Sequence, residues 1–336
     1  REDYEDHYRT KKWTASSTLN QKFSAKSNLR AGLIASLISF DYYKKAKEND
    51  LAPLKEMINT KGRTQTVQAF AQWQYKPAGR LTLNGGFHYL RLLYNQTAAI
   101  EPRAYIKWQA GGKTSVAFAV GGHSQMQALG VYFAQKETAP GHFTHPNREL
   151  GLTRAVHYVV SVVHFLKKDL AVKSELYYQH LYKVPVSIYD SSTVSTLNIE
   201  REFLTDPLVN KGRGRNYGME LSLEKYLSNR LYYTVSTSLY ESKYTAADGI
   251  ERDTRFNGNY LVNFVAGKDF LSSGKARTFG INLKMIYAGG LRETPIDFDR
   301  SALEGNTVYK EKEAFTLQNP AYFRTDLRLS IKWDRQ

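Results

Sequence analysis

Two short motifs in this sequence invite a catalytic or metal-binding interpretation. The segment Gly111-Gly-Lys-Thr114 resembles the end of a phosphate-binding loop, but the glycine that such a loop needs five residues earlier is replaced by Lys107, and no helical periodicity follows. His142 and His145 lie three residues apart, whereas a zinc site needs three or four converging donors. Three further carboxylates lack the spacing and the central glycine of a calcium loop: Asp297, Asp299 and Glu304. We therefore predict a turn, solvated loops, and neither a resident metal nor a cofactor.

Other signals of catalysis are missing as well. The sequence has no cysteine, no Gly-X-Ser-X-Gly nucleophile elbow and no His-Glu-X-X-His zinc motif. The formal charge is +15, but basic and acidic residues are interleaved along the whole length. Dispersed charge lacks the one-sided basic surface that phosphate neutralisation needs, so we predict no nucleic-acid partner. We also predict that the protein is not an enzyme.

The strongest signal is an alternation with a period of two. In three segments every second residue except Thr237 and Thr325 is apolar or aromatic, while most of the residues between them are polar, charged or small: 231–240, 279–288 and 323–333. Such alternation places the two sets of side chains on opposite faces of a strand. The 24 tyrosines and 16 phenylalanines suit half-buried strands better than helices. The sequence therefore predicts an all-β fold.

Short and long connections alternate along the predicted strands. Short polar turns are expected at 76–80, 111–114, 225–230 and 270–275, and long polar segments at 44–64, 135–149, 183–211 and 289–319. Outer-membrane barrels have this asymmetry, with short periplasmic turns and long extracellular loops. We count about thirteen strands, whereas bacterial single-chain barrels close with an even number. Part of the wall is therefore expected to lie outside this sequence.

Helical signals are weak. No stretch approaches the roughly 20 apolar residues of a membrane-spanning helix, and the mean hydropathy is −0.51. A barrel strand needs only every second residue to be apolar. The best helical spacing predicts a short amphipathic helix in the first long loop: Leu51, Leu54, Met57 and Ile58. Aromatic residues near strand ends, such as Tyr42, Trp73, Tyr232 and Tyr287, favour the girdles of a membrane barrel, although ordinary cross-strand packing is the alternative.

The alternation also predicts which residues face the lumen. A Lys or Arg facing lipid at mid-depth would cost ~2–4 kcal/mol, so the polar set of each strand should point inward. Six inward residues near the long-loop ends are our candidates for solute contact: Glu101, Arg103, His123, Gln125, Tyr240 and Arg324. Inward polar residues of any such barrel also contact a plug, one another or water, and this alternative stays open.

Several segments resemble TonB-dependent receptors of the Bacteroidetes type. They are NKGRGRNYGMELSLEKYL at 210–227, TRFNGNYLVNFVAGKDF at 254–270, YAGG at 287–290 and TPID at 294–297, preceded by IEPR at 100–103, HSQ at 123–125, YYQHLY at 177–182 and VPV at 184–186. They occur in order over nearly the whole chain. The resemblance implies a 22-stranded barrel with an N-terminal plug, energised by TonB. The sequence departs from the complete pattern because it has no recognisable plug or TonB motif and ends before the expected last strands.

Together these observations predict that residues 1–336 form part of one antiparallel transmembrane β-barrel domain, without the plug and the final strands. The expected function is TonB-dependent import of a scarce solute, such as a ferric chelate, cobalamin, a glycan or a peptide, across the outer membrane of a Gram-negative bacterium. The expected partners are outer-membrane lipid and lipopolysaccharide, the TonB complex, the plug and a surface lipoprotein. A passive porin-like barrel and a soluble β-sandwich binding module are the alternatives.

Overall fold

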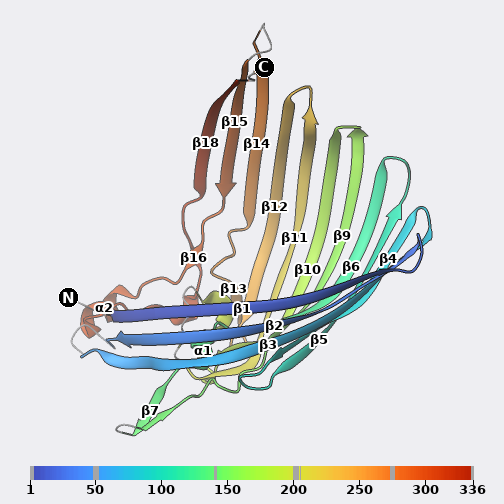
Figure 1. Ribbon diagram of the computed structural model, residues 1–336. Helices are drawn as coiled ribbons and strands as arrows, with labels where there is room; N and C mark the ends of the chain where they lie inside the picture. The colour runs from blue at the N-terminus through green and yellow to red at the C-terminus, as the bar shows by residue number, and fades with distance from the viewer. Residues whose placement is uncertain are drawn as a thin grey trace.

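One curved antiparallel sheet contains most of the chain (Figure 1). The computed structural model describes residues 4–47, 53–139, 142–199, 204, 206–272 and 277–333. Within these ranges thirteen strands follow one another in sequence order, and the short β13 (Glu251–Asp253) adds to β12. The thirteen are β1 (Tyr4–Lys22), β2 (Ser27–Ala46), β3 (Lys55–Ala78), β4 (Leu81–Leu92), β5 (Ala98–Gln109), β6 (Thr114–Gln125), β9 (Thr153–Lys167), β10 (Leu170–Ser187), β11 (Leu208–Ser228), β12 (Leu231–Thr245), β14 (Tyr260–Leu271), β15 (Arg277–Ala288) and β18 (Tyr322–Trp333).

The connections lie at two different ends of this sheet. Short turns join β1 to β2, β3 to β4, β5 to β6, β9 to β10, β11 to β12 and β14 to β15. We call this edge the turn end and the opposite edge the long-loop end. The long connections carry the remaining elements: α1 (Leu129–Tyr132), β7 (Lys136–Ala139), β8 (His142–Thr144), η1 (Thr196–Asn198), β16 (Arg292–Glu293), α2 (Phe298–Glu304), η2 (Glu311–Glu313) and β17 (Leu317–Gln318). The predicted asymmetry is confirmed.

Two predictions for the first long connection were wrong. Most of 44–64 is strand and not loop, because β2 continues to Ala46 and β3 begins at Lys55. Met57 and Ile58 belong to β3 and form no helix; Ile58 pairs with Lys44 and is fully buried. Leu51 lies outside the described residues. Backbone pairing between β2 and β3 holds this polar segment in extended form, although its side chains lack clean alternation.

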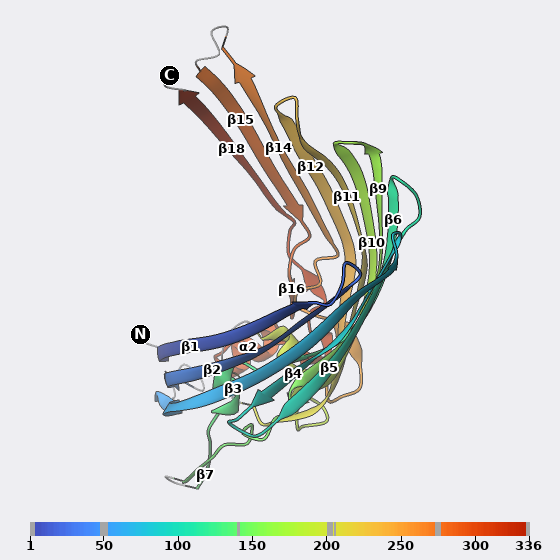
Figure 2. The same cartoon turned by 45° about the vertical axis from the view of Figure 1, so that its right-hand side comes forward.

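The sheet is the wall of an open cylinder. Its concave side faces left in Figure 2, where α2 and β16 lie, and β1 and β18 end the strand order without meeting each other. The described part of the barrel is therefore not closed. A curved wall of consecutive antiparallel strands is what the alternation predicted.

A folded-back loop packs on the concave face at the long-loop end. Phe40 and Tyr42 of β2 contact Phe133, which follows α1, with ring centroids 4.2 and 6.2 Å apart. Tyr132 lies in the same cluster and accepts a hydrogen bond from the Gln127 amide at 3.2 Å. Burial raises the pKa of Tyr132 to about 12. Tyr42 thus belongs to this internal cluster and not to an outer aromatic girdle.

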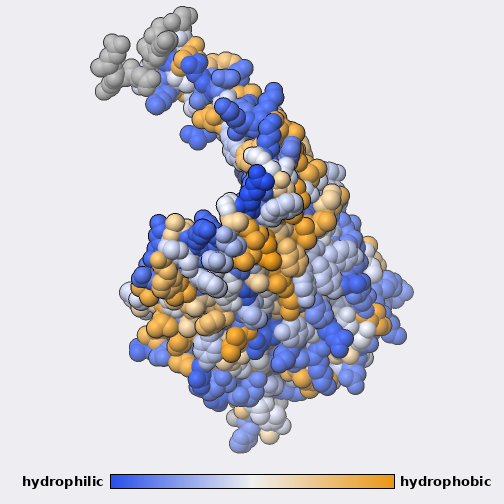
Figure 3. Space-filling model, turned by 90° about the vertical axis from the view of Figure 1, so that its right-hand side faces the viewer, coloured by the Kyte–Doolittle hydropathy of each residue, from blue (hydrophilic) through white to orange (hydrophobic). Residues whose placement is uncertain are grey.

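The convex face carries large exposed hydrophobic side chains. Figure 3, which looks at this face, shows hydrophobic patches across it. Trp108 is 54% exposed and Leu327 is 65% exposed. Among the described residues no helix is long and apolar enough to span a membrane. The hydrophobic side chains that alternate along the strands are thus turned outward and not pressed into a sandwich core.

Aromatic residues mark both limits of the convex face. In the middle of β10 and β11, Tyr178 lies opposite both Tyr158 and Tyr217, and at the long-loop end of β15, Tyr287 contacts Tyr260 and Phe323. Near the turn end the exposed rings include Trp73, Trp108, Phe270, Phe279 and Trp333. Phe323 and Trp333 lie ten positions apart on β18, which is about 33 Å at 3.3 Å per residue. A strand tilt of about 40° reduces this to about 25 Å, the height of the apolar band in outer-membrane barrels.

Candidate functional site

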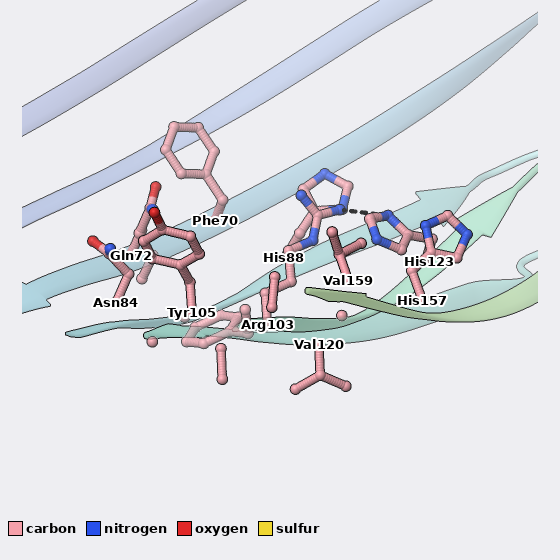
Figure 4. Close-up of a pocket in the computed structure, with 17 residues that line it drawn as sticks. Phe70, Gln72, Asn84, His88, Arg103, Tyr105, Val120, His123, His157 and Val159 are labelled. Carbon is pink, nitrogen blue, oxygen red and sulfur yellow. Dashed lines mark hydrogen bonds between the residues drawn. The ribbon is translucent and has the colours of Figure 1, made fainter. Parts of the chain in front are cut away.

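A pocket lined by both polar and apolar side chains opens on the concave wall between β3, β4, β5, β6 and β9, and we call it the polar pocket after its arginine and histidine side chains. Its volume is about 510 Å³. Figure 4 shows its lining side chains on one side of the sheet, whereas Val120 points to the other side. The polar and aromatic lining consists of Phe70, Gln72, Asn84, Phe87, His88, Arg103, Tyr105, His123 and His157.

The strand register explains why these side chains meet. Arg103 of β5 lies opposite Gly121 of β6, which lies opposite His157 of β9. All three positions have the parity that faces the lumen. Gly121 leaves space at the base of the pocket, because a Cβ at this position would lie 3.1 Å from His123 Nε2 and 3.4 Å from Arg103 Cγ. A glycine between two bulky inward side chains therefore creates the space that the pocket occupies.

Glu101 anchors one side of the pocket. This residue is only 2% exposed. Its Oε1 accepts hydrogen bonds from the Ser124 amide (3.0 Å) and hydroxyl (2.5 Å), and its Oε2 accepts one from Arg103 Nη2 at 2.7 Å and lies 2.9 Å from His88 Nδ1. A buried carboxylate is stable only when donors surround it, and here β4 and β5 supply one each and β6 supplies two. Glu101 therefore positions Arg103 and His88 and presents no unoccupied oxygen to the lumen.

Arg103 and two histidines form the exposed part of the cluster. The Arg103 side chain remains 49% exposed despite its bond to Glu101. Its Nη2 lies 3.4 Å from His123 Nδ1, and the His123 ring stacks on the ring of His157 with centroids 4.2 Å apart (Figure 4). A guanidinium held in place by a carboxylate keeps donors available for a second anion. The arrangement suits a solute with an anionic and planar polar group.

The polar wall continues beyond the pocket toward β12. Asn216 donates a hydrogen bond to Gln179 Oε1 at 3.0 Å and accepts one from the Ser242 hydroxyl at 2.7 Å. The Ser242 hydroxyl accepts a hydrogen bond from the Thr254 hydroxyl at 2.8 Å. Gln179 lies opposite His157, so this row extends the pocket across three more strands. None of these residues was among the six predicted contact residues, although Gln179, Asn216 and Ser242 have the same lumen-facing parity.

The structure brings together three of the six predicted contact residues. Arg103 and His123 line the pocket and Glu101 bonds to Arg103 beneath it, while Gln125 lies two positions beyond His123 at the end of β6. Tyr240 lies elsewhere on the same face, with its hydroxyl 3.5 Å from the Phe256 carbonyl oxygen. Arg324 is on β18, where its Nη2 donates to Asp326 at 2.8 Å. Register places all six on the concave face, and their contact with solute stays a prediction.

The two short motifs that invited a catalytic or metal-binding interpretation lie in the connections between the long strands. Gly111 donates its amide to the Thr114 carbonyl oxygen at 3.4 Å in the turn between β5 and β6, which confirms the turn. His142 lies in β8 and His145 follows it, both exposed. Within the described ranges no group of three or more potential metal ligands converges.

A family model described as "TonB dependent receptor-like, beta-barrel" matches residues 1–336. The chain belongs to this family. The match confirms the resemblance at the level of the family and the prediction of its antiparallel barrel fold. No protein among the curated sequences matches the chain.

Solved structures of outer-membrane transporters have the same fold. The FrpB iron transporter of Neisseria meningitidis is 13% identical with a TM-score of 0.60, over 98% of this chain and 49% of the other. The ferric yersiniabactin uptake receptor FyuA of Yersinia pestis is 10% identical with a TM-score of 0.65, over 99% and 48%. The ferric-catecholate import receptor Fiu of Escherichia coli K12 is 11% identical with a TM-score of 0.66, over 96% and 48%. The chain thus spans about half the length of these transporters, and at such identities the likeness shows the fold alone.

Proposed function

We propose that this chain forms part of the barrel of a TonB-dependent transporter, of the Bacteroidetes type, in the outer membrane of a Gram-negative bacterium. One observation carries the proposal: the same strands are hydrophobic on the convex face and polar on the concave face. Lipid cannot satisfy backbone groups, so a sheet that faces lipid must close into a barrel. In the complete protein we expect a plug within the lumen and TonB as the source of energy. We infer transport and not catalysis.

The solute that we propose is anionic, such as a ferric chelate or an acidic glycan. The Arg103–His123–His157 cluster presents cationic and aromatic groups to the lumen. The chain carries an excess of 15 positive charges, which favours anions at longer range. The solved relatives named above are described as an iron transporter and as receptors for ferric chelates. Outer-leaflet lipid and lipopolysaccharide would contact the convex face, and a surface lipoprotein would cover the long loops.

Growth and uptake in a deletion strain test this function. The strain lacking the complete gene is grown on limiting iron, cobalamin, peptides or glycans, with and without a functional TonB. We expect one solute to support growth only when both the gene and TonB are present. Uptake that needs the gene but not TonB would instead identify a passive porin, and unchanged growth on every solute would contradict import.

A further inference from the structure

The convex face has an apolar hollow directly behind the polar pocket. It has a volume of about 300 Å³ and lies between β5, β6, β9 and β10. Its apolar lining includes Ile100, Pro102, Ala104, Val120 and Val156, and Arg103 and His123, which also line the polar pocket, contribute as well. Gly122 leaves the hollow open, because a Cβ at this position would lie 3.2 Å from Pro102 Cδ. The shape and lining suit an alkyl chain rather than a polar solute.

Cationic side chains lie at the long-loop side of this hollow. Arg154 and Tyr182 both line it, and Tyr182 is paired with Arg154 on one side and with Arg213 on the other. Strands are about 4.8 Å apart, so the two arginine backbones lie about 10 Å apart with the tyrosine between them. Long guanidinium side chains can converge over that distance on a single anionic group.

Arg154 and Arg213 have no carboxylate partner among the residues that the structure describes. Arg154 Nη2 donates to the Ala98 carbonyl oxygen at 2.7 Å, and the Arg213 side chain is exposed with no acceptor among the residues that the structure describes. Nearby acidic residues pair with other cations instead: Glu251 with Arg215 at 2.6 Å, and Glu241 and Asp253 with Lys243. The Arg154–Tyr182–Arg213 group therefore retains its positive charge.

A row of three paired tyrosines indicates how deep the Arg154–Tyr182–Arg213 group would lie in a membrane. Tyr158, Tyr178 and Tyr217 lie four residues along their strands from Arg154, Tyr182 and Arg213, toward the middle of the sheet. Aromatic rows of this kind lie at the level of the lipid head groups. A cationic group just beyond such a row lies where the phosphates of the outer leaflet are found.

We propose that the hollow seats an acyl chain of a phosphorylated lipid of the outer leaflet, and that Arg154, Arg213 and the Tyr182 hydroxyl contact its phosphate. This inference rests on the proposed location in the outer membrane, but not on the identity of the transported solute. Arginine binds phosphate through paired hydrogen bonds, which a zwitterionic head group satisfies less well because its ammonium repels the guanidinium.

Lipid retention by the full-length receptor tests the proposal. The purified receptor is mixed with bisphosphorylated lipid A, and the bound lipid is measured by native mass spectrometry. We expect the variant Arg154→Gln/Arg213→Gln to retain at least about tenfold less lipid A, the equivalent of about 1.4 kcal/mol, because it removes both cationic contacts with the phosphate. The matched control is Lys268→Gln, which removes a positive charge from the same face near the turn end. It should retain lipid A like the parent protein.

Two further measurements separate the phosphate from the acyl chain. Dephosphorylated lipid A should bind about as weakly to the parent protein as lipid A binds to the double variant. The variant Val156→Trp fills the hollow with a large ring and should weaken lipid A binding while leaving both arginines in place. Equal retention by the double variant and the parent, or equal binding of dephosphorylated lipid, would overturn the proposal. Displacement of lipid A by inorganic phosphate alone would also overturn it, because the hollow would then contribute nothing.

The same samples distinguish this inference from the proposed function. Insertion into phospholipid vesicles, read from the heat-dependent mobility of a folded barrel on a gel, reports the membrane location. If the receptor inserts and retains lipid A through the two arginines but imports no solute, the lipid site stands and the transport proposal fails. If it imports a solute while the double variant retains lipid A fully, the lipid site fails alone.

Discussion

The two faces of β5, β6 and β9 carry different side chains on the same backbone. On the concave face Arg103, His123 and His157 surround a polar pocket, and one position along each strand the convex face has Ala104, Gly122 and Val156 around an apolar hollow. Both faces share the same backbone, turns and register. The difference therefore comes from the medium that each face meets, since lipid excludes unpaired charge whereas a lumen solvates it. Four predictions test this difference, from the largest expected effect to the smallest.

The largest effect should come from a charge placed on the convex face. Val160 is exposed on this face near the middle of β9, and its neighbour Val159 lines the polar pocket. Val160→Arg should lower the free energy of unfolding by ~2–4 kcal/mol, because the guanidinium would face hydrocarbon. Val159→Arg should lower it by less than about 1 kcal/mol, because the lumen solvates a charge. Urea unfolding of the full-length protein in vesicles measures both, and equal losses would contradict the assignment of faces.

The next effect concerns the carboxylate that organises the concave pocket. Glu101→Gln replaces an acceptor of hydrogen bonds from Ser124, Arg103 and His88 by an amide that accepts through one oxygen only. We expect a loss of about 1–3 kcal/mol in the free energy of unfolding, since a donor of the cluster then lacks its acceptor. The control is Glu220→Gln, an exposed carboxylate for which the structure shows no hydrogen bond among the described residues. A loss at position 220 as large as that at position 101 would show that charge, and not the cluster, is responsible.

The third prediction concerns solute capture. Arg103→Gln should weaken binding of an anionic solute by about tenfold, the equivalent of about 1.4 kcal/mol or one charge-assisted hydrogen bond. Arg324→Gln should weaken it less, because Arg324 lies on β18 and already donates twice to Asp326. Titration of the full-length receptor with the solute found in the growth experiment gives both affinities. A larger loss of affinity in Arg324→Gln than in Arg103→Gln would contradict solute binding in the pocket and place the binding site near β18.

The smallest effect should be a pH dependence at the long-loop end. Burial raises the pKa of Asp206, and the nearby charge of Glu311 acts in the same direction. A carboxyl whose pKa is higher in the folded state contributes stability below its unfolded pKa of about 3.9, and this is lost as the pH rises through the folded value. Asp206→Asn should therefore make hydrogen exchange of the Leu208 amide, which donates to Asn147, a few-fold less dependent on pH. Asp190→Asn, in an exposed part of the same connection, should leave that dependence unchanged.

Alternation along the strands was enough to predict the face of each candidate residue, but not its partners. A period of two assigns Glu101 and Arg103 to the lumen, yet the donors to Glu101 come from β4 and β6, and only the register brings them there. Likewise, Tyr42 looked like a girdle residue because it is aromatic and near a strand end. It is internal because the loop containing Tyr132 and Phe133, about 90 positions later, folds back onto it. Such long-range packing leaves no local pattern.

The error over residues 44–64 has a different physical origin. Polar residues and helical spacing at Leu54, Met57 and Ile58 suggested a loop with a helix. Instead, both strands are extended by backbone pairing of Tyr43 with Asn59 and of Asp41 with Lys61. The Asp41 and Lys61 side chains also form an ion pair at 3.2 Å. Backbone hydrogen bonds to an existing neighbour outweigh weak local preferences at the end of a long hairpin.

Accessibility of single labels on β9 tests the central claim most directly. The chain has no cysteine, so residues 157 to 162 can be replaced one at a time by cysteine and spin-labelled, provided that the rest of the complete protein is also free of cysteine. In vesicles, labels at 158, 160 and 162 should collide with dissolved oxygen, which concentrates in lipid, and labels at 157, 159 and 161 with a water-soluble nickel complex. Alternation with this phase would support a convex face in lipid and a concave face in water. Equal accessibility at all six positions, or the opposite phase, would contradict it.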